Sequence, residues 1–128
     1  MQLEGVRKHC LSFPSATETV QWGSDLVFKI GGKMFAVCTT EPAPVFMSFK
    51  CSPEDFAELT ERPGIIPAPY LARAQWVALE TEDALPTAET KRLLRLAYDI
   101  VLAKLPKSQQ AKLGGGAPAK AKAKPKAR

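Results

Sequence analysis

At residues 26–38 the chain reads LVFKIGGKMFAVC, and this stretch decides the fold. Apolar residues alternate through its first half, with Lys29 on the other face, which is the period of a half-buried strand. A second apolar run follows at residues 33–39. Gly31 and Gly32 separate the two runs and can supply the positive φ values that a tight hairpin turn requires. The stretch therefore predicts a β-hairpin.

More strands are expected on both sides of this hairpin. Alternating apolar residues from Thr19 onward indicate one of them. A third run, at residues 45–50, follows EPAP at 41–44, where the prolines discourage ladder pairing. Residues 76–79 predict a short strand. Residues 65–70 hold two prolines, so we expect an ordered loop there rather than a strand.

Three helices are expected around these strands. Apolar residues recur at helical spacing in residues 3–12 and again, over a longer stripe, in residues 86–105. A shorter helix starts at Ser52, because serine is a good N-cap and Pro53 suits the first helical position. It ends at Pro63-Gly64. Together the elements predict an α+β domain over residues 1–105.

The net charge of +5 is not spread evenly along the chain. Residues 106–128 hold six lysines, one arginine and no acidic residue, so they carry +7 and the preceding 105 residues carry −2. The segment alternates lysine with alanine and proline and has few large apolar side chains. We therefore expect a disordered Lys/Ala/Pro-rich basic tail, because such a segment cannot offset its ordering entropy.

Residues that carry enzyme chemistry are scarce. His9 is the only histidine, and it adjoins Cys10 on a helix, where neighbouring side chains point about 100° apart. Cys10, Cys38 and Cys51 lack metal-ligand spacing and are expected to be buried free thiols. We expect no catalytic site, no metal and no cofactor. With no apolar run of membrane-spanning length and no signal-peptide pattern, we expect a monomer in the cytoplasm, where it could associate with the nucleoid.

Several short motifs are similar to those of the MmcQ/YjbR family. They are WG at 22–23, FKIGGKMFA at 28–36, KCSP at 50–53, IP at 66–67 followed by Trp76, and AY at 97–98 leading into KLPK at 104–107. The resemblance covers about residues 1–107. Many relatives that it resembles carry a His, Asn, Lys and His cluster before the tryptophan, whereas this chain reads YLARAQW at 70–76, with Arg73 as the only charge.

The resemblance implies a CyaY/frataxin-like fold. In that fold an antiparallel sheet, here of about four to five strands, has the N- and C-terminal helices packed on one face. The family is labelled DNA-binding. The resemblance therefore implies DNA, or another nucleic acid, as the partner.

The candidate nucleic-acid-binding residues are all basic. In the folded part they are Lys29, Lys33, Lys50 and Arg73; in the tail they are Lys107, Lys112, Lys120, Lys122, Lys124, Lys126 and Arg128. Lys29 and Lys33 flank the two-residue turn, and on neighbouring strands they would repel each other unless an anion lay between them. The alternative is that they are solvated lysines on an exposed face. Trp22 and Phe46 either stack on bases or, as is commoner for strand aromatics, belong to the core.

The leading hypothesis is a non-enzymatic, largely sequence-independent DNA-binding protein. A mobile polycation binds phosphate backbones by releasing counterions and needs no fixed fold to do so. The alternative is a small module that recognises a protein or an anionic small molecule through the sheet and residues 65–70. In that case the tail is incidental, for example a solubilising appendage.

Overall fold

The computed structural model describes residues 1–21, 25–39, 45–69 and 71–113. The elements are α1 (Leu3–Leu11), β1 (Thr17–Gln21), β2 (Asp25–Ile30), β3 (Lys33–Cys38), β4 (Met47–Lys50), α2 (Pro53–Leu59), β5 (Ile65–Pro67), the short 3-10 helix η1 (Ala72–Ala74), β6 (Trp76–Leu79), α3 (Thr87–Ala103) and α4 (Lys107–Leu113). The strands form one sheet in the order β1-β2-β3-β4-β6-β5, and every neighbouring pair is antiparallel. The predicted α+β class is confirmed, with six strands instead of four or five.

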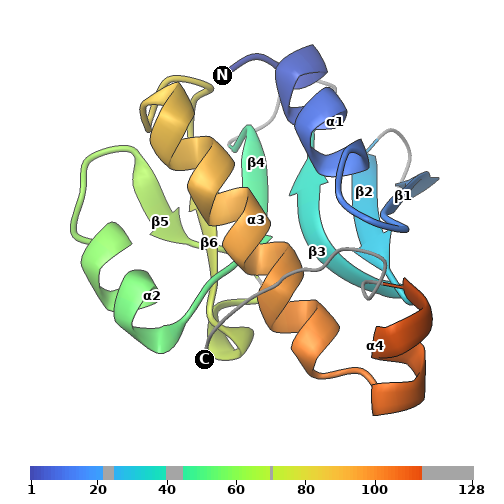
Figure 1. Ribbon diagram of the computed structural model, residues 1–128. Helices are drawn as coiled ribbons and strands as arrows, with labels where there is room; N and C mark the ends of the chain where they lie inside the picture. Colours follow the sequence, from blue (N-terminus) through green and yellow to red (C-terminus); the bar gives the residue numbers. More distant parts are fainter. Residues whose placement is uncertain (22–24, 40–44, 70, 114–128) are drawn as a thin grey trace.

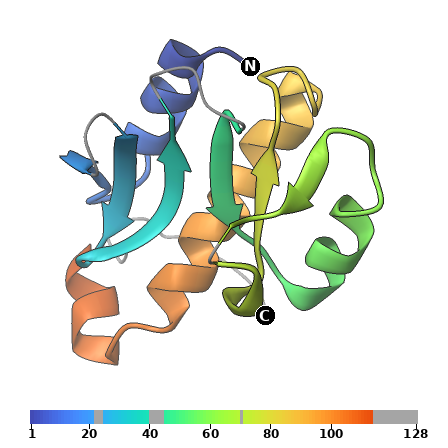
Figure 2. The same cartoon turned by 180° about the vertical axis from the view of Figure 1, so that it is seen from behind.

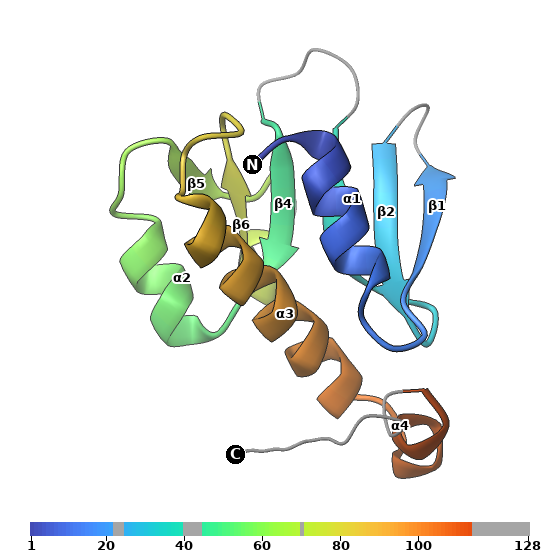
Figure 3. The same ribbon diagram turned by 45° about the horizontal axis from the view of Figure 1, so that its top comes forward.

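The helices gather on one face of the sheet. α1 and α3 lie side by side across it, and α2 stands beside β5 and β6 (Figures 1 and 3). Figure 2 shows the opposite face, which none of the described α-helices covers. We call this the open face. None of the helices in the described ranges is both long and apolar enough to cross a membrane.

Strand side chains alternate between the two faces, as the pleat requires. Phe28, Phe49 and Val77 lie on one row of paired residues and are fully buried under α1 and α3. The neighbouring row, which includes Val37 and Ala78, belongs to a separate, smaller apolar cluster on the open face. The main core therefore lies between the sheet and the helices.

Aromatic rings join α1, β3 and α3 inside that core. The ring of Tyr98 on α3 lies 5.0 Å from Phe13 and 5.6 Å from Phe35, the latter edge-on at 87°. The Tyr98 hydroxyl donates a 2.6 Å hydrogen bond to the carbonyl of Pro14, which follows α1. Burial raises the pKa of Tyr98 to about 12, so the phenol keeps the proton it donates. One side chain thus ties the longest helix to the connection between α1 and β1.

The predicted hairpin is confirmed as β2–β3. Gly31 and Gly32 both have positive φ, +60° and +81°. The register shifts between Phe28 and Lys29, so that Phe35 is an extra residue on β3 and the strand bends over the core. A Cβ at Gly31 would lie only 2.5 Å from Cδ1 of Leu105. Gly31 is therefore needed both for its backbone conformation and for close packing under the end of α3.

Gly31→Ala and Gly32→Ala separate these two requirements. Both substitutions place a side chain in the left-handed region, which costs about 1–2 kcal/mol. Nothing lies within 4 Å of a Cβ at Gly32, whereas a Cβ at Gly31 also overlaps Leu105. We expect Gly31→Ala to lower the free energy of unfolding by about 1–3 kcal/mol more than Gly32→Ala does, because of overpacking. Urea denaturation of both variants measures the difference, and equal losses would contradict the close contact.

The helix predicted from Ser52 is confirmed as α2, although it ends at Leu59, before the Pro63-Gly64 end that was expected. The Ser52 hydroxyl accepts a hydrogen bond from the Asp55 amide at 3.1 Å, and Pro53 occupies the first turn. The ranges expected at residues 3–12 and 86–105 correspond to α1 and α3. The strands expected at 45–50 and 76–79 correspond to β4, which starts later at Met47, and β6.

The expected loop at residues 65–70 was wrong in its first half. Ile65 and Ile66 pair with Leu79 and Ala78, which makes β5. The prolines do not prevent this because β5 is an edge strand. Proline lacks an N–H, and an edge strand tolerates it where that position faces away from the neighbouring strand. This strand raises the number from the predicted four or five to six. Tyr70 lies outside the described residues.

The disordered tail was predicted to begin at residue 106, but residues 107–113 form α4. Gln110 Nε2 donates to the carbonyls of Ala103, at 3.2 Å, and Leu105, at 2.7 Å, and so caps the C-terminus of α3. Leu113 packs against the main core. Tertiary contacts of these two residues outweigh the polar composition of the segment.

Candidate nucleic-acid interface

The register separates Lys29 from Lys33. Lys29 lies opposite Met34, and Lys33 lies opposite Ile30. Directly paired residues share a face. Met34 belongs to the open-face cluster, whereas Ile30 is buried in the main core, so the two lysines belong to opposite faces of the sheet. The structure therefore does not support an anion site between Lys29 and Lys33, because Ile30 and not Lys29 lies opposite Lys33 across the two-residue turn. Solvated lysines, the other alternative, agree with this arrangement.

The strand directions bring other basic residues to one end of the molecule. β3 begins at Lys33, beside the hairpin turn, and β4 runs antiparallel to it, so β4 ends at Lys50 on the same side of the sheet. Trp76, the first residue of β6, pairs with Lys50 and brings η1, with Arg73, to this end. One end of the sheet therefore holds three basic residues that are far apart in the sequence: Lys33, Lys50 and Arg73.

The C-terminus of α3 and the whole of α4 lie at the same end (Figure 1). The side chains of Leu105 and Leu113 both lie close to Gly31, where they occupy the space that a Cβ would take. α4 is therefore packed against the hairpin turn. This adds Lys104, Lys107 and Lys112. We call the resulting set the basic end: Lys33, Lys50, Arg73, Lys104, Lys107 and Lys112.

Lys50 is the most constrained member of the basic end. It is half-buried, and its Nζ donates to the carbonyl of Ala74 in η1. Burial, and then the nearby Lys104 ammonium, lower the pKa of Lys50. The ammonium groups of Lys50 and Lys104 lie near each other and repel. A phosphate oxygen between them would remove this repulsion, so the pair favours binding of a phosphate.

Ion pairs in the described ranges are made by arginines. They are Arg7 with Glu4 and Glu18, Arg62 with Glu58 and Glu89, Arg92 with Glu89, and Arg95 with Asp99. None of these pairs includes a lysine. The acidic residues at the start of α2, Glu54 and Asp55, lie at the same end as Lys50 and meet the positive end of the helix dipole. Five acidic residues of the described part of the chain are therefore paired with arginines, whereas the lysines of the basic end lie outside these pairs.

The structure also answers the alternatives for the aromatic and sulfur side chains. Phe46 packs against the main core, as expected for a strand aromatic; Trp22 lies outside the described residues. The three cysteines are free and buried. Burial raises the pKa of Cys38 to about 12 and that of Cys51 to about 11, which keeps both thiols protonated. Within the described part of the chain, no cluster of three or more His, Cys, Asp or Glu side chains is placed to hold a metal ion.

A pocket of about 500 Å³ lies on the open face. Met34, Val37, Val45 and Leu71 supply most of its apolar wall, and Asp25 is its one charged lining residue among those described. Such a lining suits an apolar or amine-bearing group and disfavours an anion. The sheet and the residues after β5 thus form a concave surface, but not one that fits the anionic ligand of the alternative hypothesis.

Sequence reasoning found Lys33, Lys50, Arg73, Lys107 and Lys112 but missed Lys104. The sequence could not reveal Lys104, because this C-cap residue of α3 comes close to Lys50, 54 positions earlier, only in the folded structure. Lys29 lies near the same hairpin turn as Lys33 but on the open face. Lys120, Lys122, Lys124, Lys126 and Arg128 lie outside the described residues.

Comparison with known proteins agrees with this fold. The crystal structure of Deinococcus radiodurans protein DR2400, described with the domain DUF419, is similar at a TM-score of 0.79 and 29% identity, covering 88% of each chain. A Pseudomonas syringae protein, Northeast Structural Genomics Consortium target PsR293, is similar at a TM-score of 0.65 and 17% identity, covering 78% of this chain and 98% of that one. The latter likeness shows the fold alone. No curated protein matches the chain.

The family model described as YjbR matches residues 11–100. This range includes the hairpin and most of the motifs on which the resemblance was based. The predicted resemblance is confirmed, and the chain belongs to the YjbR family.

Proposed function

We propose that this chain is a non-enzymatic DNA-binding protein that holds duplex DNA largely independently of sequence. The observation that carries the proposal is the basic end, where Lys33, Lys50 and Lys104 lie at the same end of the molecule as α4. Residues 114–128 continue the chain from Leu113, the last residue of α4, and contain five more basic residues. Phosphate contacts of this kind give affinity and orientation without reading bases.

The charge distribution supports an electrostatic mode of binding. Residues 1–105 carry −2 overall, so attraction to DNA depends on where cations are concentrated. The lysines of the basic end are outside the arginine ion pairs, and each phosphate that they neutralise releases condensed counterions. The proposal includes a cytoplasmic, nucleoid-associated location and a monomer as the binding unit.

The non-enzymatic part of the proposal rests on the reactive groups. His9 lies within 3.0 Å of the Lys91 carbonyl through Nε2, and a carbonyl only accepts, so Nε2 carries the proton of that bond. The buried thiols have raised pKa values, as described above. A nucleophile paired with a base is thus not formed among the described residues.

Neutralising part of the basic end tests the proposal in the full chain. We expect Lys33→Gln/Lys107→Gln/Lys112→Gln to make the logarithmic salt slope of duplex binding less negative by about 2.7, since each lost phosphate contact removes about 0.9. All three lysines are exposed, so the fold is retained. Fluorescence anisotropy with a random 20-base-pair duplex, between about 50 and 200 mM salt, measures the slope.

The matched control changes three basic residues outside the basic end: Lys8→Gln/Lys91→Gln/Arg92→Gln. It removes the same net charge from other parts of the described fold. The proposal expects a slope close to that of the unmodified chain. If both triple variants lose the same affinity, binding depends on net charge alone and the basic end is not the interface.

The open-face pocket favours a second candidate function, recognition of a small apolar or amine-bearing molecule or of a protein side chain. Its support is the apolar wall around Val37 with Asp25 at the side. An apolar amine that raises the melting temperature of the full chain, and whose effect is lost in Asp25→Asn, would favour this function. It makes no use of the basic end.

A further inference from the structure

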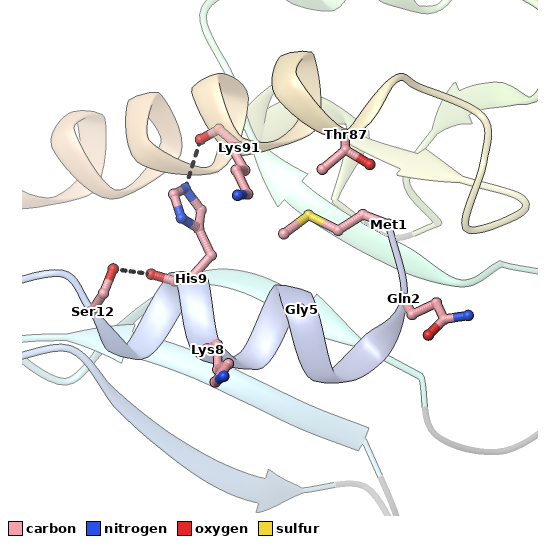
Figure 4. A pocket seen from close by; sticks show the side chains of 8 residues that line it. All are labelled: Met1, Gln2, Gly5, Lys8, His9, Ser12, Thr87 and Lys91. Carbon is pink, nitrogen blue, oxygen red and sulfur yellow. Dashed lines mark hydrogen bonds between the residues drawn. The ribbon is translucent and has the colours of Figure 1, made fainter.

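A groove of about 700 Å³ lies between α1 and α3, on the side of the molecule where α3 begins. Figure 4 shows the His9 ring reaching from α1 toward the Lys91 carbonyl of α3, with the Met1 side chain beside Thr87. The His9 hydrogen bond closes one end of the groove and fixes the two helices relative to each other. The volume lies within the range of small-molecule sites, which is about 300–1,000 Å³.

Among the described residues, the titratable side chains that line this groove are basic. They are Lys8 and His9 from α1 and Lys91 from α3. The nearest acidic residues along the two helices, Glu4 and Glu89, are held by Arg7 and Arg62 at 3.1 and 2.9 Å. The hydroxyls of Ser12 and Thr87 add neutral donors. This chemistry suits an anion that accepts several hydrogen bonds, and a phosphate group does so.

Two further features keep the groove open and favourable to negative charge. Gly5 lies in the interior of α1, where glycine is a poor helix former, and its lack of a side chain leaves space in the groove. Thr87 begins the 17-residue α3, whose N-terminus has no side-chain cap. The first amide N–H groups of that helix therefore retain hydrogen-bonding capacity beside the lysines.

The groove is separate from the basic end. Lys91 and Lys104 are thirteen residues apart on α3, which at 1.5 Å per residue is about 20 Å. A recess between two packed helices does not admit a DNA duplex, whereas a single phosphorylated molecule can enter it. We propose that the α1–α3 groove binds a small phosphorylated molecule of about mononucleotide size, independently of DNA binding.

The test uses AMP as the probe and the full, isotope-labelled chain. NMR titration is expected to shift the amide signals of Gly5, Ser12 and Thr87 in a saturable manner. Adenosine, which lacks the phosphate, is expected to leave them unchanged. Lys8→Gln/Lys91→Gln is expected to weaken AMP binding about tenfold or more, because the positive charge that lines the groove is lost.

Gly5→Leu provides a second variant that fills the groove without removing charge. A Cβ at this position makes only ordinary contact with the flexible Met1 side chain at 3.5 Å, and its φ is not in the left-handed region. It is expected to abolish AMP binding, while the control Lys33→Gln/Lys107→Gln leaves AMP binding unchanged. The proposal is overturned if AMP shifts no groove signal, if adenosine shifts them equally, or if both groove variants bind AMP normally. Duplex DNA that shifts the groove signals in place of AMP would also overturn it.

Discussion

Deleting residues 114–128 is expected to make the logarithmic salt slope of DNA binding less negative by about 4.5. The deletion takes away five of the seven positive charges of residues 106–128 and leaves the basic end, including Lys107 and Lys112 on α4. Each phosphate contact contributes about 0.9 to the slope, so five lost contacts account for the change. Between about 50 and 200 mM salt, the fold loss of affinity should therefore be about 500 times smaller for the deletion than for the unmodified chain. Anisotropy titrations of both chains measure this.

A length-matched control distinguishes charge from chain length. In it, all five basic residues of 114–128 are changed to glutamine: Lys120, Lys122, Lys124, Lys126 and Arg128. We expect this variant to bind as weakly as the deletion. If it binds as tightly as the unmodified chain, residues 114–128 do not act through charge. Undiminished affinity of the deletion would refute their role altogether.

Tyr98→Ala is expected to have the largest effect on stability. The side chain is fully buried and contacts Phe13 and Phe35. Its hydroxyl also satisfies the carbonyl of Pro14. Removing a buried aromatic ring leaves a cavity and costs about 3–5 kcal/mol. Urea denaturation, monitored by circular dichroism, should therefore show a much lower midpoint urea concentration for unfolding.

Tyr98→Phe separates the hydroxyl from the ring. It keeps the aromatic packing and removes only the bond to Pro14, which is worth about 1 kcal/mol. A loss as large as that of Tyr98→Ala would mean that the hydrogen bond, rather than ring packing, holds α3 to the α1–β1 connection. A negligible loss in both variants would contradict the central place of this aromatic cluster.

Local sequence signals predicted the parts of the fold that depend on local physics. The two glycines of the β2–β3 turn have the expected positive φ values, and Ser52 with Pro53 starts α2 as expected. These features are set within a few residues by backbone sterics and orphan amide groups. α1 and α3 were visible because a helix packed on a sheet needs an apolar stripe.

The elements that sequence reasoning missed depend on distant partners. β5 is a strand because Ile65 and Ile66 pair with Leu79 and Ala78 of β6. α4 is a helix because Gln110 caps the C-terminus of α3 and Leu113 packs on the hairpin turn. Neither segment has a strong local pattern of its own. Proline disfavours a strand in the first segment, and the second is too short and too polar to be a stable helix without tertiary contacts.

The candidate interface was likewise only half visible. Individual lysines could be named from the sequence, but not their grouping, because the antiparallel order of β3, β4 and β6 decides which lysines share an end. Of the two alternatives for Lys29 and Lys33, the shared anion site is not supported, and Lys104 was overlooked. The α1–α3 groove was not foreseen, since its residues come from the first and last parts of the domain.

Binding of the full-length chain to two 20-base-pair duplexes of unrelated sequence, measured over a range of salt concentrations, tests the central claim most directly. The account predicts a slope of about −6 or steeper for both duplexes and dissociation constants within about threefold of each other. Absence of binding at about 50 mM salt, a slope near zero, or a hundredfold preference for one duplex would contradict it.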